Sequence, residues 1–86
     1  MDIAKIEWES KTKEKVIKKH GFTIHEVEEV FQGDKRIKAH AGVYVALGAS
    51  ISGKYLVVVF RKQSNDSIKI ITARKMTKSE KKQYRS

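Results

Sequence analysis

Apolar and polar residues are arranged along the chain in a pattern that predicts one short strand, then two helices, and then a series of strands. A short strand over Ile3–Trp8 opens the chain. A lysine-rich helix over about Lys11–His20 follows it, with Ser10 as the N-cap and Gly21 in the left-handed position past the helix end.

The second helix has the sharpest local signal. Thr23 and Glu26 form a T-x-x-E capping box, in which each side chain accepts a hydrogen bond from a free backbone N–H of the first turn. Phe22 and Val27 stand at the two positions of a hydrophobic staple, and Gly33 is expected to end the helix. The residues expected to face the core from the two helices are Val16, Ile17, Ile24, Val27, Val30 and Phe31.

From Lys35 onward the pattern of apolar and polar residues is that of β-strands. Strands are expected over Lys35–Ala39, Val43–Ile51, Tyr55–Phe60 and Ser67–Arg74. The first of these is short and polar, as at a sheet edge, and Tyr55–Phe60 is a continuous apolar run, as in a central strand. Ser52 and Gly53 form a hairpin turn, and Gln63–Asp66 form a polar turn.

A second T-x-x-E box at Thr77 and Glu80 predicts a closing helix over Lys78–Tyr84. Glu80 is expected to cap this helix and, if the helix end lines a site, to orient an arginine. The element order is therefore β-α-α-β-β-β-β-α. Helices followed by consecutive hairpin strands indicate an α+β fold with an antiparallel sheet, and residues 1–86 are taken as a single domain.

Positive charge is concentrated in the second part of the chain. Residues 1–34 hold six Lys/Arg against eight Asp/Glu, whereas residues 35–86 hold thirteen against two, so that a net charge of −2 is followed by one of +11. Such a stretch is typical of a protein that binds nucleic acid or an acidic partner, although a solvated lysine-rich surface looks the same. No cysteine, membrane span or signal peptide is recognised, so we expect a cytoplasmic protein without membrane contact.

Most catalytic motifs are absent from the sequence. His20, His25 and His40 are scattered and no cysteine accompanies them, so neither a metal nor another cofactor is expected. The basic stretch holds only Asp66 and Glu80, which argues against a glycosidase-type mechanism with two carboxylates flanking the bond. A surface of Lys, Arg, His and Tyr can still cleave RNA without a metal, because the ribose 2′-OH is an internal nucleophile.

Each candidate residue has a functional and a structural interpretation. The candidate catalytic residues are Lys19, His20, Arg61, Arg74 and Tyr84, and the candidate RNA-binding residues are Lys54, Lys62, Lys69, Lys75 and Lys78. Lys19 and His20 either serve the reaction or stabilise the end of a helix dipole. Arg61 and Arg74 end strands, where they form a phosphate clamp or are solvated, and Tyr84 packs or stacks on a base. The functional interpretation needs the helix end and both strand ends to converge.

Taken in order, several short segments resemble the BrnT family of toxins over nearly the whole chain. These segments are Ile6–Glu9, Lys19–Thr23 with Glu26 and Val30–Phe31, then Gly48, Gly53 and Leu56–Arg61, and finally Ile70–Lys75 with Thr77, Glu80 and Tyr84. The chain departs from the family where it has Val43 in place of a frequent arginine and Val16 in place of a frequent asparagine.

The resemblance implies a RelE-like toxin of a type II toxin–antitoxin system, a metal-independent endoribonuclease that cleaves mRNA. It also implies a cognate antitoxin, itself a small DNA-binding protein, and contact with operator DNA only through the toxin–antitoxin complex. Two alternatives stay open at this point. One is a catalytically silent module that binds nucleic acid or the antitoxin in operon autoregulation, and the other is a protein-interaction domain.

Overall fold

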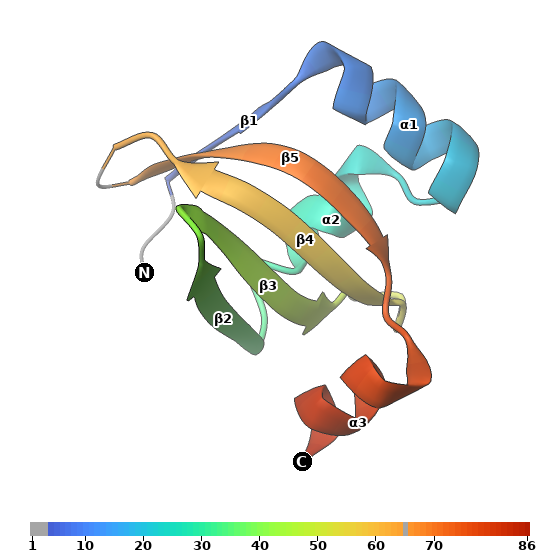
Figure 1. The fold of residues 1–86 in the computed structure, drawn as a ribbon. Coiled ribbons are helices and arrows are strands. Elements are labelled where there is room, and N and C mark those ends of the chain that lie inside the picture. Colours follow the sequence, from blue (N-terminus) through green and yellow to red (C-terminus); the bar gives the residue numbers. More distant parts are fainter. Residues whose placement is uncertain (1–3, 65) are drawn as a thin grey trace.

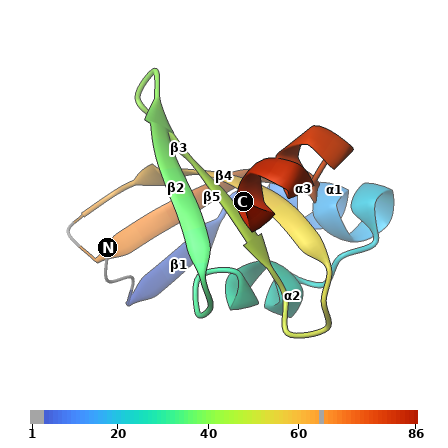
Figure 2. The same ribbon diagram turned by 90° about the horizontal axis from the view of Figure 1, so that it is seen from below.

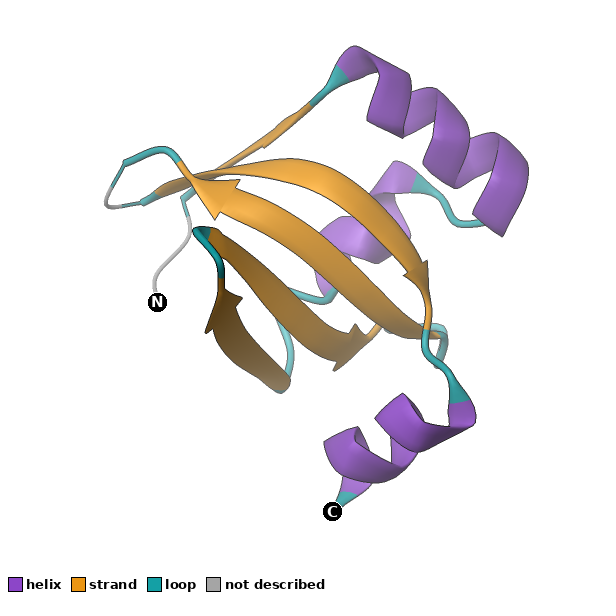
Figure 3. Cartoon of the chain, viewed as in Figure 1, coloured by secondary structure: helices purple, strands orange, loops and turns teal. Residues whose placement is uncertain are grey.

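Over residues 4–64 and 66–86, which the computed structural model describes, the chain forms three helices and one five-stranded sheet (Figures 1 and 3). The elements are β1 (Lys5–Trp8), α1 (Ser10–His20), α2 (Ile24–Glu29), β2 (Lys35–His40), β3 (Val43–Ala49), β4 (Tyr55–Lys62), β5 (Ser67–Lys75) and α3 (Lys78–Arg85). This order confirms the α+β prediction. Ile3 and the side chains of Ser10 and His20 lie outside the described part. None of the described helices is long and apolar enough to cross a membrane.

The strands lie in the order β1-β5-β4-β3-β2, so β4 is central and β2 is an edge strand, both as predicted. The pairs β2–β3, β3–β4 and β4–β5 are antiparallel. The pair β1–β5 is parallel, which the expectation of an antiparallel sheet did not include. A parallel neighbour needs a long crossover, and here the chain between β1 and β5 includes both α1 and α2.

Both α1 and α2 pack on one face of the sheet, and the main core lies beneath them (Figure 1). The buried residues of this core are Val16, Phe22, Val27, Val30, Ala46, Leu56, Val58, Phe60, Ile68, Ile70 and Ala73. The capping box of α2 is complete, because the Thr23 hydroxyl accepts from the Glu26 N–H at 3.0 Å and the Glu26 carboxylate accepts from the Thr23 N–H at 3.0 Å. Phe22 and Val27, the predicted staple pair, are both buried in this core.

Three local predictions for the helices are wrong. Glu9 and not Ser10 is the N-cap of α1, because the Glu9 carbonyl accepts the N–H groups of the first turn. Ile17 is 51% exposed, since the buried stripe of α1 runs through Thr12 and Val16, four residues apart. The helix α2 ends at Glu29 and not at Gly33, because the residues after Glu29 form turns with hydrogen bonds between residues three apart.

A β-bulge in β5 connects the sheet to α1. Val59 pairs with Thr72 and Phe60 pairs with Ile70, so Ile71 is an extra residue in β5. The Ile71 carbonyl accepts a hydrogen bond of 2.7 Å from the buried Thr12 hydroxyl of α1. The Thr12 hydroxyl thus gives a hydrogen-bond partner to the carbonyl of the bulged residue Ile71.

Close approach of α2 to the sheet depends on a glycine. A Cβ atom added to Gly48 in β3 would lie 2.6 Å from the Cγ1 atom of Val30, a side chain that is fully buried. A β-branched side chain in a packed core has no free rotamer into which it can move. The absence of a side chain at Gly48 therefore sets how closely Val30, and with it the end of α2, packs on the sheet.

We predict that Gly48→Ala lowers the free energy of unfolding by about 1–3 kcal/mol, because it overpacks this contact. The measurement is urea denaturation of the parent, Gly48→Ala, Val30→Ala and the double variant. Val30→Ala removes the clashing methyl groups, so Gly48→Ala should cost less in that background. Equal costs in both backgrounds would show that the contact does not limit the packing.

Candidate functional site

The sheet has a second face that α1 and α2 do not cover, and we call it the open face. Side chains alternate along each strand, so the residues between the core positions point to this face. From β2 to β5 the open face carries Arg36, Lys38, His40, Val43, Val45, Leu47, Val57, Val59, Arg61, Lys69, Thr72 and Arg74. Its strands therefore contribute several cationic groups, whereas the core face contributes mainly apolar ones.

Helix α3 covers one end of the open face (Figure 2). Its Tyr84 packs with a small second cluster built on Leu47, Val57 and Met76. The Tyr84 hydroxyl donates to the Asp34 carbonyl at 2.7 Å. Beyond Val57 the open face is less covered, and Val59 of the central strand is only half-buried.

One cross-strand row places two arginines at the covered end. The register aligns Arg36 with Leu47, Leu47 with Val57, and Val57 with Arg74. Arg36 donates to the main-chain carbonyl of Ser86 at the end of α3, and Arg74 binds the first turn of the same helix. Both cations of this row therefore hold α3 in place.

Arg74 and Glu80 form a two-bond ion pair, with Nη1–Oε1 at 2.7 Å and Nη2–Oε2 at 2.8 Å. Glu80 also completes the predicted capping box with Thr77, whose N–H it accepts at 2.8 Å. Hydrogen bonds from Arg74 are the largest cause that lowers the pKa of Glu80, from 4.5 to about 2. The prediction that Glu80 both caps the helix and orients an arginine is confirmed in its geometry.

The Arg74 guanidinium keeps one hydrogen-bonding edge available. Its Nη1 donates to Glu80 and to the Lys75 carbonyl, and its Nη2 donates one bond to Glu80. Among the described residues, none accepts from Nε–H or from the second Nη2–H, which lie side by side on the remaining edge of the guanidinium. The side chain is 46% exposed, so this edge can bind an anion while Glu80 holds the other.

A shallow pocket of about 280 Å³ lies next to this ion pair, between α3 and strands β2 and β3. Glu80, Lys38 and His40 all line it. Sequence reasoning rejected His40 as a metal ligand and did not consider Lys38. The signal that could have found both is the basic alternation Arg36, Lys38, His40 along an edge strand.

The expected convergence of Arg61 and Arg74 is wrong. Because β4 and β5 are antiparallel, Arg61 pairs with Lys69 at one end and Arg74 pairs with Val57 at the other. Arg61 lies four positions beyond Val57 along β4, which corresponds to about 13 Å at 3.3 Å per residue. Both arginines still point to the open face, so one extended ligand could reach both.

The remaining candidates do not lie together at one site. Lys19 is exposed in the last turn of α1, which packs on the core face, so it is not part of the open face; the side chain of His20 lies outside the described part. Tyr84 uses its ring and hydroxyl in packing against Tyr55 and Asp34. Of the candidate RNA-binding lysines, Lys69 lies on the open face, Lys62 ends β4, Lys54 and Lys75 line a second pocket, and Lys78 is exposed on α3.

The depressed pKa of Glu80 predicts a dependence of stability on pH. A carboxylate with a lowered pKa stabilises the fold above its unfolded pKa of 4.5, and this contribution is lost as the pH falls towards about 2. Glu80→Gln keeps a capping side chain but removes the ion pair, so its Tm should be lower than that of the parent at pH 7. The difference should shrink between pH 4.5 and pH 2.

Thermal unfolding followed by circular dichroism across this pH range is the measurement. Glu14→Gln is the matched control, since Glu14 is exposed in α1 and makes no ion pair with any described residue. A constant Tm difference between the parent and Glu80→Gln from pH 7 to pH 2 would rule out this ion pair as the cause.

Of three comparisons with known proteins, two found a match and one did not. Residues 8–80 match a family model described as the ribonuclease toxin BrnT of type II toxin–antitoxin systems. A search by sequence among curated proteins gave no match. Among solved structures, the chain is similar to the ribonuclease toxin BrnT of Brucella abortus, with a TM-score of 0.69 and 19% identity over 86% of this chain and 97% of that chain. At this identity the structural likeness shows a shared fold.

Proposed function

This chain belongs to the BrnT family of ribonuclease toxins of type II toxin–antitoxin systems, and we propose that it is a metal-independent endoribonuclease that cleaves mRNA on its open face. The observation that carries the proposal is the available edge of Arg74. Its Nε–H and Nη2–H face no acceptor among the described residues, and a phosphate group fits two parallel N–H donors. Glu80 holds the guanidinium so that it does not have to reorganise when the substrate binds.

The reaction consistent with these groups uses the RNA as its own nucleophile. The 2′-oxygen attacks the adjacent phosphorus, the bond from phosphorus to the 5′-oxygen breaks, and the products are a 2′,3′-cyclic phosphate and a free 5′-hydroxyl. One proton leaves the 2′-OH and one reaches the 5′-oxygen. We propose His40 as the proton carrier, because an imidazole accepts and donates protons near neutral pH and His40 lines the same pocket as Glu80. His40 lies four residues along β2 from Arg36, whose cross-strand row contains Arg74, so the RNA would have to bring the reacting bond to a position between Arg74 and His40.

The other basic groups of the open face would hold the rest of the RNA. Lys38 lines the same pocket as His40. Arg61 of β4 and Lys69 of β5 stand opposite each other in the strand register, further along the sheet. Val43 pairs with His40 on this face, so the position where the family often has arginine lies beside the proposed proton carrier. The roles predicted for Lys19 and His20 stay predictions.

The family membership also implies a cognate antitoxin as the partner of this chain. We propose that this antitoxin is a small DNA-binding protein, and that the toxin meets operator DNA only through their complex. The +11 charge of residues 35–86 favours acidic or nucleic-acid partners, and we propose that the protein acts in the cytoplasm without membrane contact.

We predict that Arg74→Ala lowers the cleavage rate by about 10²–10³-fold, because it removes a group that stabilises charge in the transition state. Arg74→Lys keeps the charge but lacks the two-donor edge, so most of the loss should remain. The measurement is cleavage of a labelled mRNA in excess EDTA, with analysis of the product ends. Arg85→Ala, which removes the same charge elsewhere on α3, should cleave as the parent does.

Because Arg74 also binds Glu80, all variants are assayed well below their measured Tm. An Arg74→Ala protein that cleaves as fast as the parent, or a parent that cleaves only with added Mg²⁺, would contradict the mechanism. Binding of RNA without any cleavage by the parent would favour the silent nucleic-acid-binding module instead.

RNA affinity should fall steeply with salt, because each neutralised phosphate of a single strand releases about 0.7 counterions. We predict that Lys69→Ala reduces the slope of log Kd against log salt by about 0.7, since Lys69 lies on the open face beside Arg61. Lys13→Ala, on the exposed side of α1, should leave the slope unchanged. Fluorescence anisotropy with a 2′-O-methyl RNA measures this, and a flat salt response in the parent would favour the protein-interaction alternative.

A further inference from the structure

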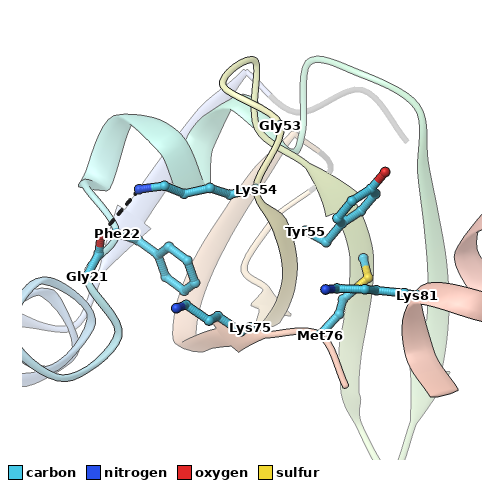
Figure 4. Close-up of a pocket in the computed structure, with 8 residues that line it drawn as sticks. All are labelled: Gly21, Phe22, Gly53, Lys54, Tyr55, Lys75, Met76 and Lys81. Carbon is cyan, nitrogen blue, oxygen red and sulfur yellow. Dashed lines mark hydrogen bonds between the residues drawn. The ribbon is translucent and has the colours of Figure 1, made fainter. Parts of the chain in front are cut away.

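A second pocket, separate from the one beside Glu80, lies where β4 begins and β5 ends (Figure 4). It encloses about 350 Å³. Its lining comes from the junction of α1 and α2, both strands and α3, and consists of Gly21, Phe22, Gly53, Lys54, Tyr55, Lys75, Met76 and Lys81. Four separate segments of the chain therefore contribute to one cavity that the proposed cleavage reaction does not use.

The pocket carries positive charge that the described residues neutralise only in part. Lys54 is paired, with its Nζ 3.0 Å from the Glu26 carboxylate and 3.4 Å from the Gly21 carbonyl. Lys75 and Lys81 pair with no carboxylate of the described residues, and no acidic residue lines the pocket. Two unpaired ammonium groups beside one cavity favour a ligand with about two negative charges, such as a phosphate group.

The wall of the pocket is apolar, which a site for a simple anion does not need. Phe22 and Met76 line it with side chains that are almost fully buried, and Tyr55 lines it with a half-buried ring. The Lys81 ammonium lies 5.8 Å from the centre of the Tyr55 ring, a cation–π contact that restrains this lysine next to the apolar wall. Figure 4 shows Lys81 and Tyr55 beside Met76, and Lys75 beside Phe22.

We propose that this pocket binds one nucleotide, with its phosphate between Lys75 and Lys81 and its base or ribose against the apolar wall. A nucleotide is the ligand class that joins a dianionic group to a flat, weakly polar ring system. An acidic protein segment would satisfy the lysines but would leave the apolar wall without a matching group. A free mononucleotide and one unit of an RNA chain offer the same base, ribose and phosphate, but an internal RNA phosphate is a diester with one negative charge, and only a terminal phosphate of RNA has two.

An RNA chain is the source that fits the neighbouring site. Consecutive strand residues point to opposite faces, so Arg74 points to the open face while Lys75, the next residue, points to the pocket. An RNA that passes over the end of β5 would place neighbouring phosphates on these two cations. This assignment to RNA rests on the proposed function, whereas the binding of a nucleotide does not.

Nuclear magnetic resonance titration of the ¹⁵N-labelled protein tests the proposal. The probes are uridine 5′-monophosphate, uridine, inorganic phosphate and a 2′-O-methyl trinucleotide that cannot be cleaved. The monophosphate should shift the amide signals of Gly21, Gly53 and Met76, which line the pocket, and should bind at least tenfold more tightly than uridine or phosphate. Equal affinity for phosphate and the monophosphate, or shifts confined to other amides, would overturn the proposal.

The trinucleotide distinguishes a site for one unit of an RNA chain from a site for free mononucleotides. Affinity at least tenfold higher than that of the monophosphate, with the same amides shifted, supports an RNA subsite. Equal affinity supports a site for free nucleotides. An acidic peptide that displaces the monophosphate and itself binds more tightly would overturn the proposal in favour of a protein partner.

Charge-matched variants test the two lysines. Lys75→Ala with Lys81→Ala should weaken binding of the monophosphate at least tenfold. Lys13→Ala with Lys15→Ala removes the same charge from the exposed side of α1 and should leave this binding unchanged. If both pairs weaken binding equally, the effect is one of net charge and the pocket is wrongly assigned. If the parent binds the monophosphate here but does not cleave RNA, the proposed function fails and the pocket stands.

Discussion

Packing of α1 and α2 on a single face of the five-stranded sheet buries the main core, and the rest of the described structure depends on this packing. The two helices that precede β2 pack on this face, and their apolar residues join those of the strands in the main core. Of the described helices, α3 alone lies on the other face, and it covers one end of that face through Tyr84. The strands can therefore carry cations at alternate positions of the open face without the cost of burying charge.

The same ion pair serves the fold and the proposed chemistry. Glu80 closes the first turn of α3 through Thr77 and holds Arg74 through two bonds. An arginine that acts on a reacting phosphate needs such support, because a flexible side chain would lose conformational entropy each time it became ordered on the substrate. The structural and functional interpretations of a strand-end arginine, which look like alternatives in the sequence, are compatible here.

The accuracy of sequence reasoning varied with the distance over which the deciding interaction acts. The capping boxes at Thr23 and Thr77 were predicted because both partners lie within four residues of each other. The separation of Arg61 from Arg74 depends on the strand register, and the bulge at Ile71 depends on a hydroxyl 59 residues away. No local pattern contains either. The basic alternation that ends at His40 was visible in the sequence, but its meaning depends on which face the helices cover.

The parallel pairing of β1 with β5 also orders the events of folding. Lys5 pairs with Ser67, 62 residues further along, whereas β2 to β5 are joined by short connections. Closing a long loop costs more entropy than closing a hairpin, and the edge that β1 needs exists only after β5 has paired with β4. We therefore expect β1 and α1 to dock last and to detach first, as a separate cooperative unit. The end of α1 at Gly21 forms part of the lysine-lined pocket, so that pocket would be complete only in molecules that have finished this last step.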